Sequence, residues 1–358
     1  MPPAQSTSAT DSNVAHTLLV ATASRATMTT MPPRRVAILD TDVVVDDLIA
    51  YAADPVRGSL LTKPLGSTRW VASSHVYREM YKSDALGNRH KFDKIAGQLA
   101  GTPCAISAEE LRHVFETCYL PMIMFVDVTG VMTEHPMAVA VEHADVKDKP
   151  TGQLAALMEA AGFLVLSRDH SLRNPGLAPA DIQPVIVDAK SVGDAELMVS
   201  TTVVVGGVTV QVMSATASGV ARRLASPNAV GWGLIAAVAL WVGAKPARRA
   251  KLRRGAQVVA TMLSEMIVAG EVGRERLAAV FVEPVPTVPL ECRVAKVLVF
   301  AQQPLLVREV RELLEREGHP LPAAADSAVR ELLRSMPCFV EAPRHRWGLG
   351  CTYDPQIS

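Results

Sequence analysis

Aromatic residues and cysteines are scarce in this 358-residue chain. Phe, Trp and Tyr together make up 4% of it, and none of the five cysteines stands in a CxxC pair. This spacing excludes a zinc ribbon and a dithiol redox motif, and the odd number of scattered thiols predicts a reduced, cytoplasmic setting. The cysteines are Cys104, Cys118, Cys292, Cys338 and Cys351.

The chain also lacks an excess of either charge and a recognisable export signal. Lys plus Arg and Asp plus Glu both number 36, so overall charge predicts neither a nucleic-acid partner nor an acidic ligand. Residues 1–33 are rich in Ser, Thr, Ala and Pro, and they have no basic start followed by a sustained apolar core. We expect a disordered tail there.

A chain of this length exceeds what one hydrophobic core usually organises, so we expect several units. Shifts in composition and hydrophobic spacing place the boundaries. The predicted units are a tail (1–33), an α/β domain (34–193), a hydrophobic segment (194–245), a helical region (246–283), a linker (284–289) and a small α+β domain (290–352).

Short apolar runs alternate with helix-compatible spacing in residues 34–193. Val36–Leu39 is predicted to be a strand that ends on Asp40, and Val43–Ala53 is predicted to be the following helix. This alternation predicts a mostly parallel sheet flanked by helices. Further strands are predicted at Trp70–Ala72, Ile123–Val128, Phe163–Ser167 and Pro184–Val187.

The hydrophobic segment has two interpretations. Residues 197–221 and 224–244 carry no charge, and six basic residues follow between Lys245 and Arg254. The first run, rich in Val and Thr around Gly206–Gly207, favours a buried β-hairpin. The run Ala229–Ala244 with its basic flank is instead typical of a membrane segment, although it is shorter than the ~20 residues that span a bilayer. In that case residues 197–244 contact a membrane.

Residues 290–352 have the pattern of a winged-helix-like domain. Helical spacing at Leu290–Phe300, Leu306–Glu317 and Asp326–Ser335 precedes an alternating stretch at Cys338–Leu349. Winged helices contact nucleic acids or proteins, so RNA, DNA and a protein are all candidate partners. Nucleic-acid contacts are predicted for Arg330, Arg334, Arg344 and Arg346.

Four acidic residues stand at the ends of predicted elements in residues 34–193. In an open α/β sheet, sites gather at the carboxyl ends of the strands, where these side chains would converge. Clustered carboxylates repel one another and favour a hard divalent cation, so we expect Mg²⁺ or Mn²⁺. The predicted catalytic and metal-binding residues are Asp40, Glu79, Asp148 and Asp169.

The segments around these acids resemble the motifs of the PIN-domain family. Residues 38–42 (ILDTD) are similar to the opening strand of PIN domains, in which the first Asp binds metal, with Asp42 where Asn is common. Residues 74–79 (SHVYRE) are similar to the second motif and residues 148–155 (DKPTGQLA) to the third. Residues 166–169 (LSRD) are similar to the Thr-x-Asp motif, with Ser for Thr, and all four motifs follow the family's order.

The resemblance implies a metal-dependent endoribonuclease that hydrolyses RNA phosphodiester bonds. Asp42, Asp145 and Ser167 are accessory candidates, and Asp145 is an alternative to Asp148. Taken alone, Asp40 and Asp148 could simply cap helices, Asp169 could stabilise a turn, and Glu79 could face solvent on its helix. The competing interpretation is a non-catalytic regulator that binds nucleic acid or protein through the winged helix, with or without a membrane tether. The cleaved RNA, the oligomeric state and an antitoxin-like inhibitor stay open.

Overall fold

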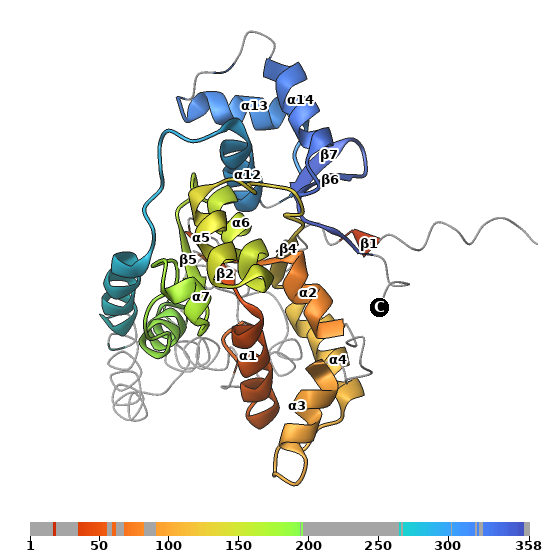
Figure 1. Ribbon diagram of the computed structural model, residues 1–358, viewed down its shortest axis with the longest axis vertical. Coiled ribbons are helices and arrows are strands. Elements are labelled where there is room, and N and C mark those ends of the chain that lie inside the picture. Colours follow the sequence, from red (N-terminus) through yellow and green to blue (C-terminus); the bar gives the residue numbers. More distant parts are fainter. Residues whose placement is uncertain are drawn as a thin grey trace, which may run out of the picture.

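The computed structural model describes residues 17–18, 35–55, 59–61, 68–81, 91–193, 195, 265, 268–301, 303–318, 321 and 325–353. Within them, four parallel strands form a sheet in the order β4-β3-β2-β5, with helices around it (Figure 1). The predicted α/β class is therefore confirmed. The strands are β2 (Arg35–Leu39), β3 (Thr68–Ser73), β4 (Ile123–Val126) and β5 (Phe163–Leu166).

Three predicted units fall largely outside the described residues. They are the tail 1–33, except for β1 (Thr17–Leu18), which pairs with β8 (Thr352–Tyr353), the hydrophobic segment 194–245, except for residue 195, and the helical region 246–283 as far as residue 267, except for residue 265. The described part of the helical region is helical over residues 268–280. In the described part of the chain, no helix has both the length and the apolar character needed to cross a membrane.

Side chains alternate between the two faces of the sheet along every strand. In β2, Val36 and Ile38 belong to the core on one face, and Ala37 and Leu39 to the core on the other. A strand whose two faces are both covered needs a continuous apolar sequence. This is why the residues before Asp40 are uniformly apolar.

Different parts of the chain cover the two faces. One face carries α1 (Thr41–Ala53), α2 (Ser74–Tyr81), α3 (Lys91–Leu99) and α4 (Ala108–Val114), which continues as a π-helical turn over Phe115–Tyr119. The other face carries α5 (Pro136–Ala144), α6 (Lys149–Leu157) and α12 (Leu290–Phe300). The sheet is thus the middle layer, and its carboxyl edge lies between the two helical layers.

The three helices predicted in residues 290–352 are present, and the alternating stretch at Cys338–Leu349 forms an antiparallel hairpin. After α12 come α13 (Val307–Arg316), α14 (Ala325–Ser335) and the antiparallel strands β6 (Phe339–Ala342) and β7 (Arg346–Leu349). The backbone of Leu305 also bridges Trp347 of β7, with hydrogen bonds of 2.8 and 2.7 Å. Figure 1 shows these elements together at one end of the molecule, and their core is continuous with that of α6.

The strand predicted at Pro184–Val187 is wrong, because residues 183–193 are helical. Buried side chains recur there every three or four residues, and Val187 is 59% exposed. The β-branched run favours a strand, but the spacing of the apolar residues around it has the period of a helix. The buried residues are Ile182, Val185, Ala189 and Val192.

Arg69 of β3 connects the sheet to the C-terminal helices. Its side chain is buried, and its Nε and Nη2 donate to the carbonyls of Val299 and Ala301 at 3.1 and 3.3 Å. Burial lowers the pKa of Arg69 to about 10, so the group still carries its charge at neutral pH. A cation is favourable there because the last carbonyls of α12 are the negative end of that helix.

We expect Arg69→Met to lower the free energy of unfolding by roughly 2–3 kcal/mol, because two helix-end carbonyls lose their charged donor. Denaturant-induced unfolding followed by circular dichroism measures this loss. Arg78→Met is the control: that arginine is 61% exposed, so its replacement should change stability by less than about 0.5 kcal/mol. Equal losses in the two variants would contradict the role given to Arg69.

Candidate metal centre

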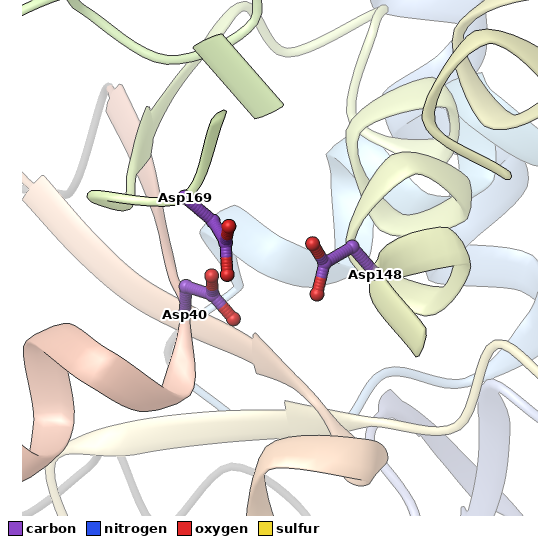
Figure 2. A group of neighbouring side chains, drawn as sticks. All are labelled: Asp40, Asp148 and Asp169. Atoms are coloured by element: carbon purple, nitrogen blue, oxygen red, sulfur yellow. The ribbon is translucent and has the colours of Figure 1, made fainter. Parts of the chain in front are cut away.

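Three of the four predicted carboxylates meet at the carboxyl edge of the sheet. Asp40, Asp148 and Asp169 each offer an oxygen within 4.8 Å of the oxygens from the other two. Figure 2 shows the carboxylates of Asp40 and Asp169 close together, with that of Asp148 facing them from a helix on the other side. Residues more than a hundred positions apart in the chain therefore share one location.

Each of these acids occupies the N-cap position of a helix. Asp40 precedes α1, Asp148 precedes α6 and Asp169 precedes α7 (His170–Arg173). Only Asp40 accepts a backbone N–H from its own helix, that of Thr41 at 2.8 Å. The carboxylates of Asp148 and Asp169 make no capping hydrogen bond. Helix capping therefore does not account for two of the three acids.

Asp40 and Asp169 meet because β2 and β5 are neighbours in the sheet. The backbone N–H of Asp40 donates to the carbonyl of Leu166 at 3.1 Å, one step beyond the paired strands. Directly after β5, Ser167 Oγ donates to Asp40 Oδ2 at 2.6 Å and accepts the backbone N–H of Asp169 at 2.9 Å. Ser167 is fully buried. This predicted accessory residue thus links two of the acids.

Asp148 reaches the group from the start of α6. Its carboxylate accepts a hydrogen bond from the hydroxyl of Ser171 on α7. The alternative that the sequence offered, Asp145, is exposed and accepts the N–H of Lys147 at 2.9 Å. Asp145 does not belong to the group of three. Of the two neighbouring acids, it is Asp148 that lies beside Asp40 and Asp169.

Glu79 does not belong to the group of three but is connected to it. Its Oε2 accepts a hydrogen bond of 2.5 Å from Thr41 Oγ1, and its Oε1 lies 3.4 Å from His75 Nε2. The contact with His75, followed by that with Thr41, lowers the pKa of Glu79 to about 2 in spite of its partial burial. Its charge also raises the pKa of Asp148. Glu79 therefore acts on the group through Thr41 and through its charge.

Asp42 connects α1 to the turn after β5. Its Oδ2 accepts the backbone N–H of Arg168 at 2.7 Å, while its buried Oδ1 has no hydrogen-bond partner among the described residues. Burial raises the pKa of Asp42, and the bond from Arg168 opposes this rise. The Arg168 guanidinium lies 2.5 Å from Asp46. Asp42 is thus beside the group of three without being a member.

The electrostatics of the group favour a bound cation. Burial raises the pKa of Asp40 to about 7, repulsion from Asp42 and Asp148 adds to this rise, and the hydrogen bond from Ser167 opposes it. Burial, and then repulsion from Asp169, also raises the pKa of Asp148. Carboxylates that resist ionisation together are relieved by a hard divalent ion, and an all-oxygen set of donors fits Mg²⁺ or Mn²⁺.

The four arginines predicted to contact nucleic acid differ in their surroundings. Arg330 and Arg334 are exposed on α14, where both line a surface depression. Arg344 is exposed in the turn between β6 and β7, at a φ of 66°. Arg346 instead donates to the carbonyl of Pro304 at 2.9 Å. Three of these side chains are therefore open to solvent, and the fourth is engaged within the fold.

Two residues of the site had no predicted role. Thr41 lies within the motif that carries Asp40, so its position was visible, but its bond to Glu79 depends on the packing of α1 and α2. Ser171 lies two residues beyond Asp169, and its contact with Asp148 depends on how α6 and α7 meet. No spacing in a single sequence signals such a contact.

Comparisons of the chain with models of known protein families, with curated proteins and with solved structures found no match.

We expect the metal-free protein to lose stability as pH rises from about 4 towards 7. The pKa of Asp40 is about 7 in the folded state against 3.8 for an unperturbed carboxyl, so over this interval only the folded state keeps the proton. The stabilisation is complete below the unfolded pKa and is lost as pH rises through the folded pKa.

Asp40→Asn should weaken this dependence, because the buried carboxyl with the pKa of about 7 is no longer present. The variant should unfold at a higher temperature than the wild type at about pH 8 in a chelator, since it never ionises in the buried position. The asparagine can keep the bond from Thr41 through its oxygen and donate to Ser167 through its amide. Thermal unfolding at several pH values measures the effect, with Asp145→Asn as control. A pH dependence as steep in Asp40→Asn as in the wild type would contradict this assignment.

Proposed function

We propose that this chain is a metal-dependent endoribonuclease of the PIN type, which hydrolyses RNA phosphodiester bonds at Asp40, Asp148 and Asp169. The observation that carries the proposal is the meeting of three carboxylates from separate elements within 4.8 Å, at the carboxyl edge of a parallel sheet. The order of the motifs in residues 34–193 supports the same class. No side-chain nucleophile is required by this chemistry.

The three carboxylates would hold Mg²⁺ or Mn²⁺. Such an ion, when bound, polarises a phosphodiester and lowers the pKa of a water that attacks it. Thr41 and Ser167 fix the two oxygens of Asp40, so this ligand is oriented before any ion arrives. Asp40 is buried, Asp148 is half-buried and Asp169 is exposed. The RNA backbone would therefore approach from the side of Asp169.

Glu79, the fourth predicted acid, has a supporting place in this proposal. Glu79 accepts a hydrogen bond from the hydroxyl of Thr41. This bond fixes the first residue of α1, which follows directly after Asp40. Because the pKa of Glu79 is low, Glu79 stays ionised and adds negative charge that attracts a cation to the group.

We also propose that residues 290–352 form a winged-helix-like unit. The order α12, the bridge at Leu305, α13, α14 and the hairpin β6–β7 supports this class. Arg330, Arg334 and Arg344 are the exposed arginines that would meet the phosphates of RNA or DNA, or an acidic protein surface. The unit would then bring the substrate, or a regulatory partner, to the nuclease.

We expect Asp148→Asn to reduce Mn²⁺-dependent cleavage of a single-stranded RNA by more than about 100-fold, because it removes a carboxylate ligand. Asp145→Asn makes the same substitution three residues upstream, and this variant should cleave RNA like the wild type. Asp40→Asn should also abolish cleavage while leaving the fold at least as stable, so that its inactivity cannot be ascribed to unfolding. Chelation of the metal should abolish RNA cleavage by the wild type. Gel analysis of a labelled RNA measures all four.

Undiminished cleavage by Asp40→Asn or Asp148→Asn would overturn the catalytic assignment. Calorimetric titration with Mn²⁺ distinguishes the nuclease from the competing function, a regulator without catalytic activity. If the wild type shows no saturable binding, the acids are vestigial and the chain is better described as a non-catalytic regulator that binds nucleic acid or protein through residues 290–352.

A further inference from the structure

One five-residue segment, residues 167–171, reaches all three acids of the metal centre. Ser167 donates to Asp40 at 2.6 Å, and Asp169 is itself part of the segment. Ser171 donates to Asp148. The segment follows β5 directly and includes the first two residues of α7, so its position is fixed by the central sheet.

The contact between Ser171 and Asp148 joins parts of the chain that no strand pairing holds together. Asp40 and Asp169 meet through the pairing of β2 with β5, but Asp148 lies at the junction of a 3₁₀ turn, Val146–Asp148, and α6. Among the described residues, no other side chain donates a hydrogen bond to its carboxylate. Ser171 is only 6% exposed, so water competes little for this bond.

We propose that Ser171 is a positioning residue of the metal centre: its hydroxyl holds the Asp148 carboxylate towards Asp40 and Asp169, so that the three oxygens face one divalent cation. This inference rests on the proposed function, since it assumes that the three acids bind a metal. Without the bond, Asp148 is half-buried at a helix start with no capping contact, and its carboxylate can turn to solvent. Residues that orient a metal ligand typically change metal affinity by roughly 10- to 100-fold.

Calorimetric titration of the full chain with Mn²⁺ tests this role without relying on cleavage. Ser171→Ala should weaken Mn²⁺ binding roughly 10- to 100-fold, whereas Ser171→Thr, which keeps a hydroxyl, should restore most of it. Ser59→Ala is the matched control: Ser59 is 1% exposed and donates to the buried Asp47 carboxylate at 2.6 Å, outside the group of three. It loses the same kind of bond and should keep the wild-type affinity.

A double-mutant cycle separates positioning from general stability. If Ser171 acts through Asp148, then Ser171→Ala should cause no further loss of Mn²⁺ affinity in the Asp148→Asn background. A serine that merely stabilised the fold would weaken binding equally in both backgrounds. Circular dichroism and thermal unfolding confirm that each variant is folded before titration.

The outcomes are distinct. If Ser171→Ala binds Mn²⁺ with the wild-type affinity, Ser171 does not position Asp148. The positioning role is also overturned if Ser171→Ala lowers the Mn²⁺ affinity equally in the wild-type and Asp148→Asn backgrounds. If Ser171→Ala fails to fold, the threonine variant decides, because a folded Ser171→Thr that binds as weakly as Asp148→Asn also overturns it. Absence of saturable binding in the wild type would instead refute the metal centre itself, so the two failures can be told apart.

Discussion

The pairing of β2 with β5 places Asp40 beside the turn that carries Ser167 and Asp169. Parallel pairing brings the carboxyl ends of both strands to the same edge of the sheet, and the bond from the Asp40 amide to Leu166 continues this pairing into the site. A slip of one residue in this register would turn Asp40 away from Ser167 and move its apolar neighbours to the wrong face. The uniformly buried strands therefore set the geometry of a polar site that they do not themselves form.

The fold holds the acids so close together that their negative charges are unfavourable in the metal-free protein. The most buried member of the group, Asp40, has a raised pKa because of burial and of repulsion from Asp42 and Asp148. Local rules of stability are commonly broken at functional sites, where the surrounding fold holds groups that would otherwise separate. Here that restraint comes from hydrogen bonds that the Ser167 and Ser171 hydroxyls and the Thr41 backbone N–H donate to the carboxylates.

The sequence predicts the central sheet well because each of its four strands is a short apolar run at the right place. It fails at residues 184–187, where a β-branched run lies within a helix and only the spacing of its buried neighbours reveals the period. For the site, the positions of the motifs predict which acidic residues lie at the ends of strands and helices. These positions favour Asp148 but leave Asp145 as an alternative, because the two acids are three residues apart and only tertiary packing turns Asp148 inward. The place of Glu79 behind Thr41 likewise depends on how two helices pack.

The helix that begins at Asp148 lies between the sheet and the C-terminal helices. Cys292 of α12 donates to the carbonyl of Ala156 in α6, and Val294 and Leu298 are buried in the same core as Leu154. A fragment ending before residue 290 would carry a bare apolar layer directly behind α6, and such layers promote aggregation. Loss of activity after that deletion would thus report a damaged scaffold, and it would not by itself reveal what the removed residues bind.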